Sequence, residues 1–182
     1  MKKIVVALCA VLLLSGLAYA QDLDSLVNEA KQSYQAQDKV GAAQKLKEAV
    51  LSIWDELPLT AVNARLNSDK NFTPKSDNVF ASGEPMYVSA EILGAKIMKQ
   101  GGIYKLSVAC DFQFLDENGN VMFGKDDFGK FDVVSPMPNT EFYLNLTYKV
   151  TGAPKGKYKL QTVVRDLNSS KSTKFAKDIE IK

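Results

Sequence analysis

Residues 153–166 read APKGKYKLQTVVRD, and this stretch decides the fold. Pro154 and Gly156 predict a turn at its start. After the turn, two sets of side chains alternate: Tyr158, Leu160, Thr162 and Val164 on one side, and Lys157, Lys159, Gln161 and Arg165 on the other. Alternation at period two is typical of an antiparallel strand that buries one face and exposes the other. The chain is therefore expected to contain half-buried strands.

The same alternation recurs through the second half of the chain. Inward-facing sets are predicted within residues 86–92, 103–115, 142–150 and 175–181. Turn signals separate them, and the clearest is Asn118-Gly119. Residues 124–130, which are rich in Gly and Asp, are expected to form a loop between two short strands. With no helical period among these segments, residues 79–182 are predicted to be an antiparallel β-sandwich of seven or eight strands, preceded by a connector over 58–78 that has room for a first strand.

The sequence pattern Gly156-x-Tyr158-x-Leu160 resembles the tyrosine corner of immunoglobulin-like sandwiches, where a Tyr opens strand F two residues before a Cys. Leu160 stands in place of that Cys. The resemblance is therefore to disulfide-free members, such as fibronectin-III-like domains and exported bacterial immunoglobulin-like modules. The Phe80-x-x-Gly83-Glu84-Pro85 and Val164-x-Asp166 patterns carry the same resemblance. It implies an adhesive, spacer or assembly role, although a fold by itself does not determine function.

The first twenty residues have the organisation of a secretory signal peptide. Lys2 and Lys3 precede an apolar run over 4–17, and Ala18-Tyr19-Ala20 is a small-x-small cleavage site. Cleavage is expected after Ala20, with export to the periplasm or the medium. The run is too short to span a bilayer, so the protein is not expected to be membrane-spanning.

Residues 21–57 predict a helical hairpin. Two apolar stripes at helical spacing are out of phase with each other, which indicates two antiparallel helices broken near Gln37-Asp38, with Asp38 as the N-cap of the second. The pair resembles a lone tetratricopeptide-type hairpin through Tyr34, Ala42, Leu46 and Ala49. A single unit does not form the groove of an array. The alternative is an amphipathic hairpin that packs on the sandwich or on a second copy.

Composition excludes several classes of function. The chain contains no His, which excludes Ser-His-Asp catalysis and His-ligated zinc. Removing Lys2 and Lys3 from the 23 basic residues leaves 21 against 21 acidic ones, and this balance gives no argument for a nucleic-acid partner. Cys110 is the one Cys beyond the signal peptide. It lies on an inward strand face and is interpreted as a small buried hydrophobe.

Two groups of side chains are candidate binding sites. Lys157, Lys159 and Arg165 share the outward side of one strand, and Lys174 can join them from the next, which predicts a face for an acidic glycan. The alternative is a solvated face whose lysines discourage edge pairing. Asp126, Asp127 and Glu117 are a weak candidate for a cation site. No cofactor is expected.

Three functions remain open at this stage. The first is a non-enzymatic interaction or assembly module of the bacterial cell envelope, which binds an envelope protein or a second copy through the hairpin. The second is a carbohydrate- or polyanion-binding module that uses the basic strand face. The third and least supported is a hydrolase that uses Asp126, Asp127 or Glu141, because nothing in the sequence fixes two carboxylates across a cleft.

Overall fold

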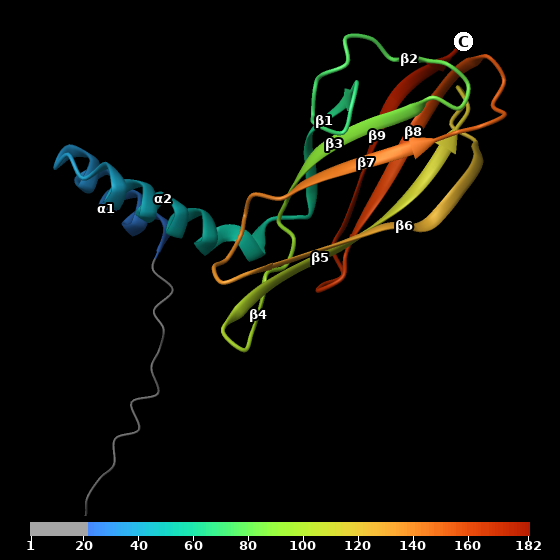
Figure 1. Ribbon diagram of the computed structural model, residues 1–182. Helices are drawn as coiled ribbons and strands as arrows, with labels where there is room; N and C mark the ends of the chain where they lie inside the picture. The colour runs from blue at the N-terminus through green and yellow to red at the C-terminus, as the bar shows by residue number, and fades with distance from the viewer. Residues whose placement is uncertain (1–21) are drawn as a thin grey trace, which may run out of the picture.

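The computed structural model describes residues 22–182, so the predicted signal peptide and its cleavage point lie outside the described residues. The chain is mainly β, with two helices at its N-terminal side (Figure 1). These are α1 (Leu23–Gln35) and α2 (Lys39–Ile53), followed by the short 3-10 helix η1 (Trp54–Glu56). Within residues 22–182, no helix is both long and apolar enough to cross a membrane.

The break between the two helices lies where the sequence predicts it. Gln37 has a positive φ of 65°, which reverses the chain, and α2 begins directly afterwards. The Oδ1 atom of Asp38 accepts a hydrogen bond from the backbone N–H of Gly41 at 2.8 Å. A side-chain cap of this kind satisfies one of the N–H groups that a helix start leaves unpaired. The predicted hairpin is confirmed.

Nine strands follow in the described residues, and they form two sheets. The strands are β1 (Thr60–Asn67), β2 (Val79–Phe80), β3 (Pro85–Leu93), β4 (Met98–Gln100), β5 (Ile103–Leu115), β6 (Val121–Ser135), β7 (Tyr143–Lys149), β8 (Gly156–Asp166) and β9 (Ser172–Ile181). One sheet has the order β1-β3-β7; the other runs β2-β9-β8-β5, with β4 and β6 both paired to β5. All pairs are antiparallel except β2 with β9. We call these two sheets the sheet pair.

The core of the sheet pair lies between the inner faces of its two sheets. The predicted inward sets are buried, including Val88 and Ile92 on β3, Val108 and Phe114 on β5, Leu144 and Tyr148 on β7, and Leu160 and Val164 on β8. Rings join the sheets, since the centroids of Phe112 and Tyr148 are 4.9 Å apart. Cys110 is fully buried, and this burial raises the pKa of its thiol to about 12. The interpretation of Cys110 as a core residue is confirmed.

A side-chain hydrogen bond closes the turn that opens β8. The hydroxyl of Tyr158 donates to the backbone carbonyl of Pro154 at 2.8 Å. The Tyr158 ring stacks on Phe114, with 4.6 Å between centroids. The tyrosine therefore fixes the turn at one end and fills the core at the other.

The predicted loop over residues 124–130 is wrong, because β6 runs without interruption from 121 to 135. β5 offers a continuous hydrogen-bonding edge, and the Gly- and Asp-rich residues pair with it through a bulge. Cys110 faces Gly129 and Phe112 faces Lys125, so three residues of β6 oppose one of β5. Asp127, within this bulge, has a φ of 48°. Eight of the nine strands, β2 to β9, lie within residues 79–182, and β1 lies in the connector over 58–78. The short β4, with three residues, was not predicted, because so few residues do not show alternation.

Candidate functional site

The helical hairpin buries few side chains and exposes large apolar ones. Between the helices lie Leu26, Ala30, Ala42 and Ala49. Exposed along the two helices are Leu23, Val27, Tyr34, Val40, Leu46 and Val50, which we call the hairpin surface. Figure 1 shows the hairpin extending away from the sheet pair, which it meets through η1. Within residues 22–182, no strand packs extensively against either helix.

One side of α2 borders an open groove. The groove has a volume of about 490 Å³ and is lined by Ala43, Leu46 and Val50 on α2, and by residues 135–141 after β6. Met137, across the groove, is 62% exposed, and Leu46 is 52% exposed. The apolar stripe of α2 therefore stands beside the sheet pair without packing into it.

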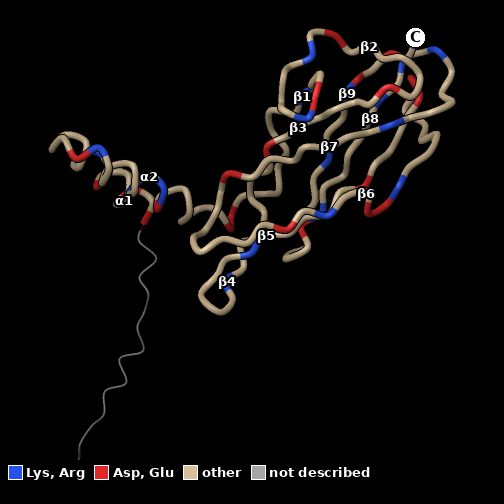
Figure 2. Tube along the Cα trace, in the orientation of Figure 1, with Lys and Arg blue, Asp and Glu red and all other residues tan. Residues whose placement is uncertain are grey.

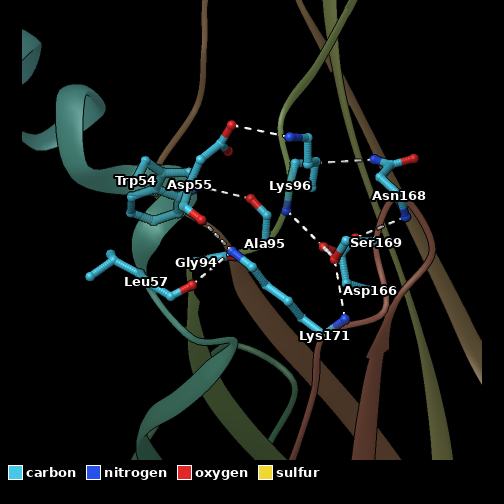
Figure 3. A network of polar contacts seen from close by, with 10 residues as sticks. All are labelled: Trp54, Asp55, Leu57, Gly94, Ala95, Lys96, Asp166, Asn168, Ser169 and Lys171. Atoms are coloured by element: carbon cyan, nitrogen blue, oxygen red, sulfur yellow. Dashed lines mark hydrogen bonds and ion pairs between the residues drawn. The ribbon is translucent and has the colours of Figure 1, made fainter.

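A polar network fixes the hairpin to the sheet pair (Figure 3). The ammonium group of Lys171, between β8 and β9, donates to the carbonyls of Asp55 at 2.9 Å, Leu57 at 2.7 Å and Gly94 at 3.0 Å. All three of its N–H donors are thereby used. The carbonyls of Asp55 and Leu57 lie at the end of η1, where a helix leaves carbonyls unpaired and attracts a cation. We call this network the joint.

Trp54 supplies the apolar part of the joint. Its indole ring is 4% exposed, and its N–H donates to the Ala95 carbonyl at 2.8 Å. The neighbouring Gly94 has a φ of 75°, and a Cβ there would lie 2.5 Å from the Pro58 carbonyl oxygen. A glycine is therefore required for the β3–β4 connection to pass this close to the chain that leaves η1.

Asp166 organises the other side of the joint. Its carboxylate is buried at the end of β8 and accepts from the Lys96 N–H at 2.8 Å and the Asn168 N–H at 2.9 Å. The side chain of Asn168 in turn donates to the Lys96 carbonyl at 3.1 Å. The Asp166 contacts hold the β8–β9 turn against the β3–β4 connection, which places Lys171 under η1.

The predicted basic face points outward but has mixed charge. Lys157 lies opposite Glu180, and Lys159 lies opposite Asp178, with 3.9 Å between Nζ and Oδ1. Lys174 pairs in register with Val163. Figure 2 shows basic and acidic residues interspersed along the strands of the sheet pair. A face of balanced charge has no marked preference for a polyanion.

Arg165 is engaged within the sheet instead of presented to a ligand. Its guanidinium donates two hydrogen bonds to Asp111, both 2.9 Å long, and one to Asp127 at 2.7 Å. The hydrogen bond from Arg165 holds the pKa of the Asp111 carboxyl below its usual range. This ion pair pins the bulge of β6 to β5 and β8.

The structure does not gather the candidate cation ligands. Asp127 pairs with Arg165, whereas Glu117 lies beside Lys157 and Lys159. Among residues 22–182, no three Asp, Glu or Cys side chains are close enough together to hold a metal ion.

Sequence reasoning did not identify the joint. Asp166-Leu167-Asn168-Ser169-Ser170-Lys171 is dense in turn residues, and this composition indicated only a turn. The available signal was an acid at the end of a buried strand face, since Asp166 continues the inward alternation of β8. The contacts of Lys171 with a segment 77 or more residues away leave no local signal.

Comparison with known proteins does not assign this chain to a family. No family model and no curated protein matches it. Among solved structures, it is similar to an alkylpurine DNA glycosylase from Pseudomonas fluorescens bound to DNA with an abasic site analogue, at 10% identity and a TM-score of 0.39 over 88% of this chain. The similarity spans 46% of the glycosylase, about half its length. A CARDB domain from Pyrococcus furiosus in complex with di-metal ions has 12% identity and a TM-score of 0.36, covering 69% of this chain and 90% of that domain. Similarities this low establish neither a shared fold nor a shared activity.

Proposed function

We propose that this chain is a non-enzymatic assembly module of the bacterial cell envelope, in which the helical hairpin docks on the hairpin of a second copy. The observation that carries this function is the hairpin surface. Six large apolar side chains are exposed on an element that the joint holds away from the sheet pair. Leu46 and Val50 of this set border one groove, and contiguous exposed apolar side chains mark interaction sites. The signal-peptide pattern supports export to the envelope.

The charges of the hairpin favour a second copy of this chain as the partner that covers the hairpin surface. Asp22, Glu48 and Glu56 lie together at the end near the sheet pair. Lys31 and Lys39 lie at the other end, on either side of the turn between the helices, and with Asp38 in that turn they leave this end one net positive charge. Two hairpins packed head to tail about a twofold axis would place the acidic end of each beside the basic end of the other. A twofold interface uses the same patch on both partners, and this hairpin meets that condition.

The proposed role for the sheet pair is that of an immunoglobulin-like sandwich serving as a rigid support. The Tyr158–Pro154 hydrogen bond supports this assignment, as does the order β1-β3-β7 opposite β9-β8-β5-β6. The thiol of Cys110, the one Cys among residues 22–182, is free, as in the disulfide-free members of that class. In this proposal the loops of the sandwich take no part in catalysis.

Sedimentation over a range of protein concentrations tests the assembly function. We expect a reversible dimer, and we expect Leu46→Lys to weaken it at least about tenfold, because an ammonium group would be desolvated in the interface. Val121→Lys is the matched control: Val121 is 54% exposed, close to the 52% of Leu46, but lies at the start of β6. A wild-type protein that stays monomeric to about 0.1 mM would contradict the proposal, as would a Leu46→Lys variant that dimerises like the wild type.

A further inference from the structure

A second surface, formed by other residues than the hairpin surface, lies on the outer face of the β1-β3-β7 sheet. The chain leaves β1, covers part of this face and returns through a bridge between Asn67 and Pro74. The side chain of Asn145 on β7 holds the cover by donating to the Lys70 carbonyl at 2.6 Å. Beside the cover is a groove of about 720 Å³, lined by Asn63, Ala64, Arg65, Phe72, Ser89, Ala90 and Tyr143. We call it the outer groove, and its volume is within the range of small-molecule sites.

One residue of the outer groove has a strained backbone. Phe72 has a φ of 65°, a region that bulky residues rarely adopt, whereas the φ of 54° at Asn63 belongs to the bulge of β1 and suits an asparagine. Backbone strain of this kind gathers at ligand sites. The strain at Phe72 is not offset by burial, since its ring remains 39% exposed. Tyr143, the second aromatic residue of the groove, is 54% exposed. Two aromatic rings that line the outer groove are therefore exposed to solvent.

The floor of the outer groove is polar and buried. Ser89 is 3% exposed and lies between Arg65 and Asn145 in the strand register. Its hydroxyl accepts from the Asn67 side chain at 3.0 Å. Asn67 and Asn145 do not line the groove, and their buried amide oxygens have no hydrogen-bond partner among the described residues. Buried acceptors of this kind are normally paired with protein groups or ordered water.

The rim of the groove can both donate and accept hydrogen bonds without a strong net charge. Asn63 donates to Glu91 at 2.9 Å, which fixes the amide and the carboxylate side by side. Arg65 adds five N–H donors, one of them 3.4 Å from the Phe72 carbonyl. One cation and one anion at the rim nearly cancel, so neither a polyanion nor a polycation is favoured. Hydroxyl groups, which donate and accept at once, match such a rim.

We propose that the outer groove binds a neutral oligosaccharide. The C–H face of a pyranose ring is apolar and flat enough to stack on an aromatic ring, and Tyr143 and Phe72 supply two such rings. The ring hydroxyls would meet Arg65, the Asn63–Glu91 pair and the Ser89 floor. This site is separate from the basic face of β8 and from the hairpin surface, so it does not depend on the proposed dimer.

Titration calorimetry with cellotriose, chitotriose, maltotriose and xylotriose tests the site on the full protein. We expect saturable binding of at least one of these sugars, weakened about tenfold by Tyr143→Ala and within about twofold of wild type in Tyr143→Phe, which keeps the ring. Val121→Ala is the control, because Val121 and Tyr143 are both 54% exposed. The inference is overturned if none of the four sugars binds, or if Tyr143→Ala binds as well as the wild type.

The same variants separate this inference from the assembly function. Tyr143→Ala is expected to sediment as the wild type does, whereas Leu46→Lys is expected to keep its sugar affinity. Loss of both properties in Tyr143→Ala, together with a lower unfolding midpoint, would show a folding defect, and Phe72→Ala, which removes the other ring of the groove, then replaces it; sugar binding by Phe72→Ala equal to that of the wild type overturns the inference. Tyr143→Phe then still tests whether the ring, without its hydroxyl, supports binding.

Discussion

Phe114 in the sheet pair and Leu26 in the hairpin are both buried, but their surroundings differ. Phe114 is fully enclosed and stacks on Tyr158, a residue from another strand. Leu26 is 3% exposed, and the other buried residues between the helices are alanines. Helices of 13 and 15 residues are marginal in water without tertiary packing. The sheet pair therefore has a core of its own. The stability of the hairpin depends instead on the joint and on any partner that covers the hairpin surface.

The largest effect is expected from truncating matched residues in the two regions. Phe114→Ala should lower the free energy of unfolding of the sheet pair by about 3–5 kcal/mol, through lost burial and a residual cavity. Leu26→Ala should leave that transition nearly unchanged but speed amide exchange across α1 and α2. Urea unfolding and hydrogen exchange measure the two quantities. Equal losses of global stability in both variants would mean that hairpin and sheet pair unfold as one unit.

A smaller effect is expected from disconnecting the regions at the joint. Lys171→Met keeps the length of the side chain but removes its three donors, leaving the carbonyls of Asp55, Leu57 and Gly94 without them. We expect a loss of about 1–3 kcal/mol and faster exchange around η1 and residues 94–96. Lys174→Met, on the exposed face of β9, is the control. If amide hydrogens exchange at the same rates in both variants, the ammonium of Lys171 does not hold the hairpin on the sheet pair.

The smallest effect concerns pH and is confined to the sheet pair. The pKa of Asp111 is depressed in the folded state, mainly by its hydrogen bond from Arg165. Its stabilising contribution is therefore complete above the unfolded pKa of about 4 and is lost as pH falls through the lower folded value. Asp111→Asn should unfold at a lower temperature at neutral pH and lose less stability on acidification. Thermal unfolding between about pH 2 and pH 7 measures this slope. If the unfolding temperatures of variant and wild type fall equally with decreasing pH, Asp111 does not contribute to acid unfolding.

Local patterns predicted most of the elements correctly. Alternation over residues 86–92, 103–115, 142–150 and 158–164 gave the buried face of each strand, because side chains of a strand point to opposite sides in turn. The break at Gln37-Asp38 was visible from the phase of two helical stripes. The failure at residues 124–130 has a physical cause, since Gly and Asp favour loops unless a neighbouring strand offers hydrogen bonds. That partner, β5, is a tertiary feature that the local composition does not contain.

The candidate sites were less predictable than the fold. Lys157, Lys159 and Arg165 were correctly placed outward, but the acids opposite them come from β5, β6 and β9. The outer groove left no motif, because it joins β1, β3 and β7 with the cover at Phe72.

By itself, the sequence determined both helices and most of the strands, which faces of these elements are apolar, and where the chain turns at Pro154 and Asp38. These properties depend on neighbours within a few residues, through side-chain periodicity and backbone preference. The tertiary structure alone decided that Lys171 closes η1, that Arg165 is neutralised, and that Phe72 and Tyr143 share one groove. Each depends on residues far apart in the chain, whose approach is fixed by strand pairing and by packing of the two sheets.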